Sequence, residues 1–209
     1  MSKIKVCHLY YDLMNLYGEN ANIRAIEKMC EYQGITCEVS LKTINDKIDF
    51  NSYDIYYMGS GDEKSELLVL EDMIKYKDKI KASIESGKTF IITGNASELF
   101  GSYIIDNDVK YDALGVFNYN SVHETFRIVG SVTFSTKLIK EKIIGFQNRC
   151  GVMNDIDKPL FKVISGTGSS INSKTEGIHY KNFYATYVFG PLLIRNPYFT
   201  NYILKNIMK

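Results

Sequence analysis

The 209-residue sequence predicts an α/β fold with a mostly parallel sheet and added antiparallel strands. Two observations lead to this prediction. Strand-like and helix-like segments alternate through the first half, which requires crossover connections and so favours parallel pairing. In the second half, aromatic and β-branched runs follow one another with little helix between them, which favours antiparallel pairing at one side of the sheet. Since neither half contains a repeat or a linker, we expect one domain over residues 1–209.

Periodicity and end signals place the elements of the first half. Strands are expected at 3–9, 36–41, 54–58 and 89–93, and helices at 21–33, 63–86 and 97–100. The helix over 21–33 carries an apolar stripe that includes Ile23 and Ile26, and Gly34 can close it in a left-handed cap. The runs at 54–58 and 89–93 are short and apolar, which is typical of buried parallel strands.

The second half is expected to contain five further strands and a last helix. The strands are at 113–122, 126–134, 143–147, 161–165 and 183–189, and the helix covers 197–208 with Pro197 in its first turn.

Composition excludes several classes of protein. Hydrophobic residues make up 45% of the chain, so it can fill a core, and the formal net charge of +1 gives no electrostatic footprint for nucleic acid. Residues 1–12 lack the apolar run of a signal peptide, and no stretch approaches the roughly 20 apolar residues of a membrane span. The four cysteines have no Cys-x-x-Cys spacing, which favours reduced thiols. We therefore expect a cytoplasmic protein that neither inserts into membranes nor binds nucleic acid.

Two glycine-bearing turns follow strands that are expected to be buried and parallel. They are Gly59-Ser60-Gly61 and Gly94-Asn95-Ala96-Ser97. Ligands bind at this edge of an open α/β sheet, because turn amides and helix N-termini face outward there. The alternative is that glycine only permits a tight turn.

The chain resembles class I glutamine amidotransferases of the cobyric acid synthase type over nearly its whole length. Six segments occur in that family's order: HLYYDLMNLYGENANIRAIEKMCEYQGI, DIYYMGSGDEKSE, TFIITGNASELFGSY, ETFRIVGSV, GFQNRCG and GIHYKNFYATYVFGPLLIRNP. Within the family the resemblance is strongest to amidotransferase subunits of lipid II isoglutaminyl synthase, which supply ammonia to a Mur-ligase-like partner for amidation of peptidoglycan D-glutamate. The resemblance implies a flavodoxin-like three-layer domain, a Mur-ligase-like partner and no cofactor.

The same resemblance places Gly94 and Phe189 at the family's catalytic positions. Relatives have a cysteine in a variant of C-G-G-Y-Q before L-x-G, where this chain has G-N-A-S-E before L-F-G. They have a histidine in T-Y-L-H-G-P, where this chain has T-Y-V-F-G-P. Glycine has no nucleophile and phenylalanine carries no proton, so the usual glutaminase mechanism is not expected. A slip in the alignment restores neither group, since no cysteine lies between Cys37 and Cys150 and no histidine follows His179.

Other positions match the family's substrate-binding residues better. Gly59, Ser60 and Gly61 correspond to the loop whose N–H groups hold the oxyanion, with Asn95 in the facing turn. Arg127 corresponds to an arginine that meets the carboxylate of glutamine, a role that suits a guanidinium. Asn148 lies in the family's G-F-x-N-x-x-G loop. Arg127 can equally be a surface arginine and Asn148 a structural residue.

Three hypotheses for function follow. The first is a non-catalytic subunit that docks on a Mur-ligase-like protein or binds glutamine or another small molecule at the former active site. The second is an active amidotransferase with Cys150 as nucleophile, although no spacing supports a histidine such as His123 or His179 within about 3 Å of it. The third is a different enzyme that uses Asp62, Glu63 or Glu98, carboxylates that otherwise serve as helix caps. No grouping of His, Cys, Asp or Glu has the spacing of a metal site, so no metal is expected.

Overall fold

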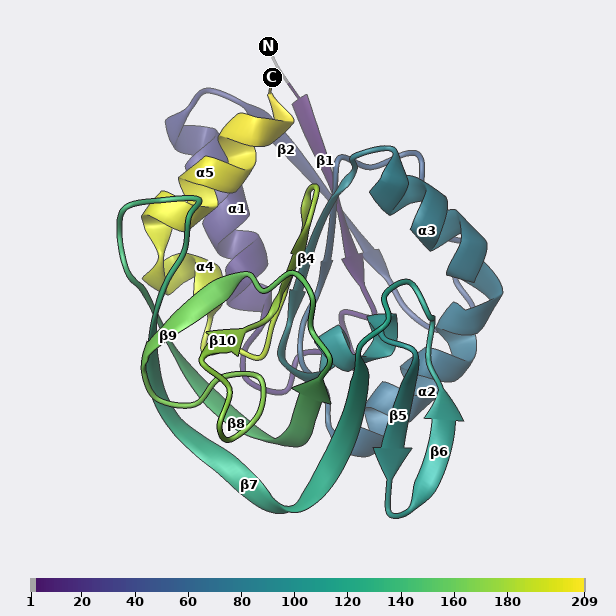
Figure 1. Ribbon diagram of the computed structural model, residues 1–209. Helices are drawn as coiled ribbons and strands as arrows, with labels where there is room; N and C mark the ends of the chain where they lie inside the picture. Colours follow the sequence, from purple (N-terminus) through teal and green to yellow (C-terminus); the bar gives the residue numbers. More distant parts are fainter. Residues whose placement is uncertain (1–2, 209) are drawn as a thin grey trace.

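The computed structural model describes residues 3–208, which form two six-stranded sheets with helices packed around the first (Figure 1). The first sheet has the order β11 (Ile178–Tyr180), β12 (Phe183–Thr186), β4 (Thr89–Thr93), β3 (Ile55–Met58), β1 (Lys3–Leu9) and β2 (Thr36–Lys42). All of its pairs are parallel except β11 with β12. The mostly parallel sheet that the sequence predicts is therefore confirmed.

The second sheet contains most of the antiparallel strands. Its order is β10 (Thr175–Glu176), β9 (Phe161–Ser165), β7 (Asn120–Ser135), β5 (Tyr103–Asp106) and β6 (Val109–Asp112), and β8 (Ile143–Asn154) also pairs with β7. All pairs are antiparallel except β5 with β7. Only β11 extends the parallel sheet in the antiparallel sense, and the other added strands form a sheet of their own.

Helices cover both faces of the parallel sheet, as Figure 1 shows. One face packs against α1 (Asn20–Tyr32), α4 (Leu192–Arg195) and α5 (Pro197–Ile207), and the other against α2 (Glu63–Met73), the 3-10 turn η1 (Ile74–Tyr76) and α3 (Lys77–Glu85). Successive side chains of a strand point to opposite faces. In β3, Ile55 and Tyr57 pack on the α1 side and Tyr56 and Met58 on the α2 side. These two cores explain why β3 is apolar along its whole length and produce the three-layer arrangement.

Several expected elements differ from the structure, among them the strand expected over 183–189, which ends at Thr186 in β12. The helix expected over 63–86 is interrupted at Tyr76, whose backbone leaves the helical region and whose hydroxyl donates to the carbonyl of Asp46 at 2.8 Å. The strand expected over 113–122 is wrong for residues 113–119. Their amides bond instead to the segment after β4, for example Leu114 N to Leu99 O at 2.9 Å and Phe117 N to Phe100 O at 3.0 Å.

Other boundaries move because of long-range pairing. The expected strand at 143–147 continues to Asn154, and that at 126–134 is part of the 16-residue strand β7, since these two strands pair with each other over most of their length. The hairpin of β5 and β6 was not predicted, although its two turn residues, Asn107 and Asp108, adopt the positive φ angles that such turns need.

The parts that position the site are the turns after β3 and β4, together with the β7–β8 pair. The chain after β4 forms a 3-10 helix, η2 (Gly94–Phe100), all but one of whose residues is buried. A bridge between Phe146 of β8 and Phe189 joins the second sheet to the segment after β12. No helix within residues 3–208 is both long enough and apolar enough to cross a bilayer.

Candidate functional site

A polar cavity of about 20 Å³ lies where the carboxyl ends of β3 and β4 meet β7 and β8. Its lining includes most of the site residues that the sequence predicts: Ser60, Gly61, Gly94, Asn95, Arg127, Asn148 and Phe189, together with Cys150. Gly59 is the exception, because it lies beneath the cavity, where an added Cβ would fall 2.5 Å from Glu19 Cβ and from Met14 O. The fold therefore brings segments that are far apart in the chain to one place.

Gly94 occupies a tight turn whose open side is filled by Ser60. Its φ of +66° is strained for any residue with a side chain. A Cβ built on Gly94 would overlap Ser60 Cβ and fall 2.5 Å from Ser60 Oγ. The space that a side chain at position 94 needs is therefore taken by the hydroxymethyl group of Ser60.

Asn95 joins the two glycine-bearing turns. Its Oδ1 accepts hydrogen bonds from Ser60 Oγ and from the backbone N–H of Gly61, each at 3.0 Å. Its Nδ2 donates to Glu66 Oε2 at 2.9 Å. Gly61 N–H is one of the groups that the resemblance implies for holding an oxyanion, and here it donates to the protein's own side chain.

Arg127, on β7, is held by neighbouring groups at the rim of the cavity. Its guanidinium donates to Glu63 Oε1 at 2.9 Å, to Asn148 Oδ1 at 2.9 Å and to Asn148 O at 3.2 Å. Because both edges of the guanidinium are engaged, it would have to release these partners to bind a ligand carboxylate bidentately.

Phe189 is buried and stacks on Tyr17, with ring centroids 4.1 Å apart and an interplanar angle of 5°. Phe146 packs against it edge-on at 6.0 Å. Phe189, which the resemblance aligns with the family's histidine, thus belongs to an aromatic cluster and has no proton to exchange.

Cys150 faces the cavity, but its surroundings favour the thiol over the thiolate. Burial raises the pKa of Cys150 to about 12, and a hydrogen bond and charge from Glu63 act in the same direction. Sγ lies 3.2 Å from Glu63 Oε1, so a carboxylate occupies the place where a nucleophilic cysteine would have a histidine.

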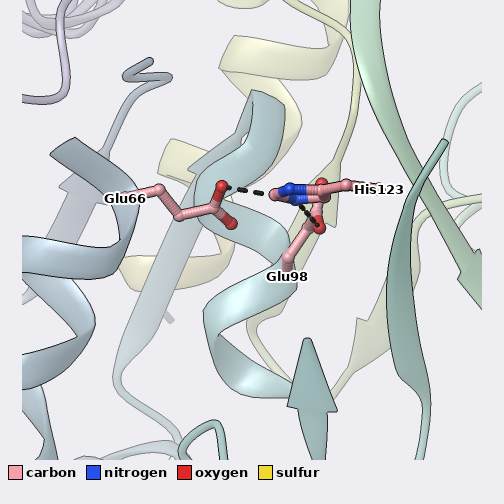
Figure 2. Close-up of side chains that lie close together, drawn as sticks. All are labelled: Glu66, Glu98 and His123. Atoms are coloured by element: carbon pink, nitrogen blue, oxygen red, sulfur yellow. Dashed lines mark hydrogen bonds and ion pairs between the residues drawn. The ribbon is translucent and has the colours of Figure 1, made fainter. Parts of the chain in front are cut away.

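The cavity also contains a second set of polar residues, which the sequence did not show to lie together. Glu66 of α2, Glu98 of η2 and His123 of β7 point toward one another in Figure 2. His123 Nε2 lies 3.1 Å from Glu98 Oε2 and 3.6 Å from Glu66 Oε2, and the two glutamate side chains are fully buried. His123 Nδ1 lies 3.1 Å from Asp106 Oδ1.

The cluster changes the pKa values of its members. Burial raises the pKa of Glu66 well above its ordinary value, and the charge of Glu98 adds to that effect. Burial alone would lower the pKa of His123, but hydrogen bonds and charges from Glu98 and Asp106 outweigh it and raise the pKa to about 9.

One signal for Glu66 was present in the sequence. Glu66 lies on the buried face of α2 with Val69, Leu70 and Met73, at the spacing of an apolar helical stripe. An acidic residue on such a stripe indicates either a buried partner or a site. No comparable signal joins it to His123, because the two residues belong to α2 and β7 and meet only in the folded chain.

The remaining candidate residues have structural contacts. Asp62 caps α2 by accepting from Ser65 N at 2.7 Å, and Glu63 pairs with Arg127. His179 stacks on Tyr184 and lines a different pocket, and His8 is buried between the rings of Tyr11 and Tyr57.

Comparisons with known proteins identify the family of the chain. The sequence profile of the CobB/CobQ-like glutamine amidotransferase domain matches residues 5–197. The chain is 30% identical to the GatD subunit of glutamine-hydrolysing lipid II isoglutaminyl synthase from Streptococcus pneumoniae over 198 residues, which cover 93% of this chain and 76% of that protein. It is 29% identical to the GatD subunit from Staphylococcus aureus over 206 residues, which cover 98% of this chain and 84% of that protein. The chain therefore belongs to the CobB/CobQ-like family of class I glutamine amidotransferases and is related to GatD.

Proposed function

We propose that this chain is a degenerate amidotransferase subunit that has lost glutaminase activity and acts by docking on a Mur-ligase-like protein. The observation that carries the proposal is the pair Ser60 and Gly94. A nucleophile at position 94 requires free space beyond its Cβ, and Ser60 fills that space. A glycine there is thus part of the packing of the site.

Three further contacts support the loss of catalysis. The side chain of Asn95 holds the N–H of Gly61, which is therefore not free to stabilise an oxyanion. Glu63 and Asn148 hold Arg127. Phe189 is stacked on Tyr17 where the family's general base is expected.

The free space in the cavity, about 20 Å³, is enough for a water molecule or an ion. Binding of glutamine or a similar small molecule would require the contacts of Arg127 and Asn95 to open.

The relatives suggest the partner and the setting. Both are named as subunits of lipid II isoglutaminyl synthase. Carried over to this chain, these names support our proposal of a single-domain subunit that acts in the cytoplasm beside an ATP-dependent Mur-ligase-like enzyme, in peptidoglycan amidation.

The alternative is an active amidotransferase with Cys150 as the nucleophile. It is favoured by one observation, the presence of Cys150 in the wall of the cavity. The raised thiol pKa and the contact with Glu63 argue against it. Cys150→Ser would abolish turnover under this alternative and change nothing under the proposal.

The test is glutamine hydrolysis, followed as glutamate and ammonia release, with the chain alone and with a co-encoded Mur-ligase-like protein. We expect no release above a heat-denatured control, and we expect the two proteins to co-elute in size-exclusion chromatography. The triple variant Ser60→Gly/Gly94→Cys/Phe189→His, which restores the space, thiol and imidazole together, serves as the reference for detectable turnover. Release by the natural chain that survives mass-spectrometric proof of purity would overturn the loss of catalysis, and failure to co-elute would overturn the docking role.

A further inference from the structure

We propose that Glu66, Glu98 and His123 bind a divalent transition-metal cation, for which Zn²⁺ is the best match. This inference goes beyond the loss of glutaminase activity and does not depend on it. It rests on three side chains from α2, η2 and β7 that converge in the cavity at the carboxyl edge of the parallel sheet (Figure 2).

The spacing of the ligand atoms suits a single ion. One nitrogen and two carboxylate oxygens all lie within 4.8 Å of one another. For a tetrahedral ion with bonds of about 2.0–2.1 Å, neighbouring ligand atoms are about 3.4 Å apart. The distances from His123 Nε2 to the oxygens of Glu98 and Glu66, 3.1 and 3.6 Å, lie on either side of that value.

Asp106 orients the imidazole in the way that metal-binding histidines require. Its Oδ1 lies 3.1 Å from Nδ1 of His123, so it can accept a hydrogen bond from Nδ1–H. Nε2, which is hydrogen-bonded to Glu98 Oε2, would release its proton on metal binding and offer its lone pair to an ion between Glu66 and Glu98. A carboxylate behind the histidine is the usual outer partner of a zinc ligand, and it also increases the basicity of the ring.

Two buried carboxyl oxygens without a hydrogen-bond partner also favour a bound ion. Glu66 Oε1 and Glu98 Oε1 have no hydrogen-bond partner, and both side chains are fully buried. Buried polar atoms are normally paired, and two unpaired carboxyl oxygens beside one small cavity fit a bound ion.

The charged groups around the cavity also favour a cation. Three carboxyl groups, from Glu66, Glu98 and Asp106, surround one imidazole. The guanidinium of Arg149, which also lines the cavity, donates to the carbonyls of Gly151 and Gly168 and lies over the ring of Tyr187. Burial raises the pKa of Glu66, so that carboxyl would release its proton when a metal binds, and a divalent cation would then balance the charges of Glu66 and Glu98.

The types of the ligand atoms, one imidazole nitrogen and carboxylate oxygens, favour particular metals. Imidazole with carboxylates suits Zn²⁺ and neighbouring first-row ions better than Ca²⁺ or Mg²⁺, which prefer oxygen alone. The cysteine nearest the cavity, Cys150, is hydrogen-bonded to Glu63 and is not needed as a ligand.

The experiment is metal binding by the full-length chain after removal of metals with a chelator. We expect about one equivalent of Zn²⁺ to remain bound after dialysis, measured by elemental analysis, and thermal unfolding to shift upward on addition of Zn²⁺. Co²⁺ in place of Zn²⁺ should give visible absorption bands of a four-coordinate nitrogen–oxygen site. Glu98→Gln and His123→Asn should each weaken Zn²⁺ binding at least ten-fold and abolish the Co²⁺ bands.

Matched controls separate this site from adventitious binding. Glu63→Gln removes a carboxylate at the rim of the same cavity, His179→Asn a histidine on another strand, and Cys150→Ser the nearby thiol, and all three should bind Zn²⁺ like the natural chain. Near-ultraviolet circular dichroism confirms that each variant is folded. Absence of stoichiometric binding by the natural chain, or equal binding by the Glu98→Gln and Glu63→Gln proteins, would overturn the proposal, whatever the glutaminase assay shows.

Discussion

The side chain of Ser60 fills the space into which any side chain on Gly94 would project. A Cβ at position 94 would lie 2.5 Å from Ser60 Oγ, and φ at Gly94 is +66°. The two residues come from turns after different strands, β3 and β4, which are neighbours in the parallel sheet. A change at either position therefore has consequences at the other.

We predict that Gly94→Cys destabilises the protein and that Ser60→Gly restores part of the loss. Overpacking costs about 1–3 kcal/mol, and a non-glycine residue at this positive φ adds a strain that Ser60→Gly cannot remove. Urea unfolding of the two single variants and the double variant measures the coupling between the positions. Additive effects would mean that the hydroxymethyl group moves aside without cost.

Asn95 should contribute more to stability than Asn148, although both line the cavity. Asn95→Ala removes the partner of Gly61 N–H and of the fully buried Glu66, so a loss of about 1–3 kcal/mol is expected. Asn148→Ala removes a contact of Arg127, which is 45% exposed, and should cost less than about 1 kcal/mol. Chemical denaturation of both variants makes the comparison, and equal losses would contradict the bridging role of Asn95.

Gly151 should tolerate no side chain, whereas Gly130 should. A Cβ on Gly151 would fall 2.7 Å from Glu98 Cδ, while a Cβ on Gly130 has nothing within 4 Å. Both glycines lie in the β7–β8 pair, so each controls for the effect of alanine in a strand. We expect Gly151→Ala to lower the free energy of unfolding by about 1–3 kcal/mol and Gly130→Ala to leave it within about 0.5 kcal/mol. Thermal unfolding distinguishes the two, and similar midpoints would show that Glu98 has room to move.

Glu176 should make stability depend on pH. Burial raises its pKa from 4.5 to about 7, and this effect is partly offset by hydrogen bonds from Thr186 and Tyr187 N and by the charge of Arg149. The folded pKa is above the unfolded one, so the stabilisation is complete below about pH 4.5 and is lost as the pH rises through about 7.

The variant Glu176→Gln tests this directly, because its amide does not titrate. The free energy of unfolding of the natural chain should fall relative to that of the variant by roughly 3 kcal/mol between about pH 4 and 8. Urea titrations at several pH values give both curves. Parallel curves would show that Glu176 has an ordinary pKa in the folded protein.

Local signals in the sequence were sufficient for β3, β4 and α1. Each of these elements has its signal within its own residues: the apolar runs of β3 and β4, and the apolar stripe of α1 with Gly34 at its end. The structure has all three, with boundaries that differ by at most a residue or two. The extent of β7 and β8 could not be found in this way, because their length comes from pairing with each other.

For the candidate site too, some features follow from the sequence and others only from the fold. Glycine at position 94 and phenylalanine at position 189 can be read from the sequence, and the family resemblance indicates why these positions matter. Three contacts appear only in the folded chain: Ser60 fills the space at Gly94, Asn95 holds Gly61, and the side chains of Glu66, Glu98 and His123 converge. The physical reason is that these contacts join β3, β4, α2 and β7 across long stretches of chain. Their distances depend on how the two sheets pack, which no local pattern of residues specifies.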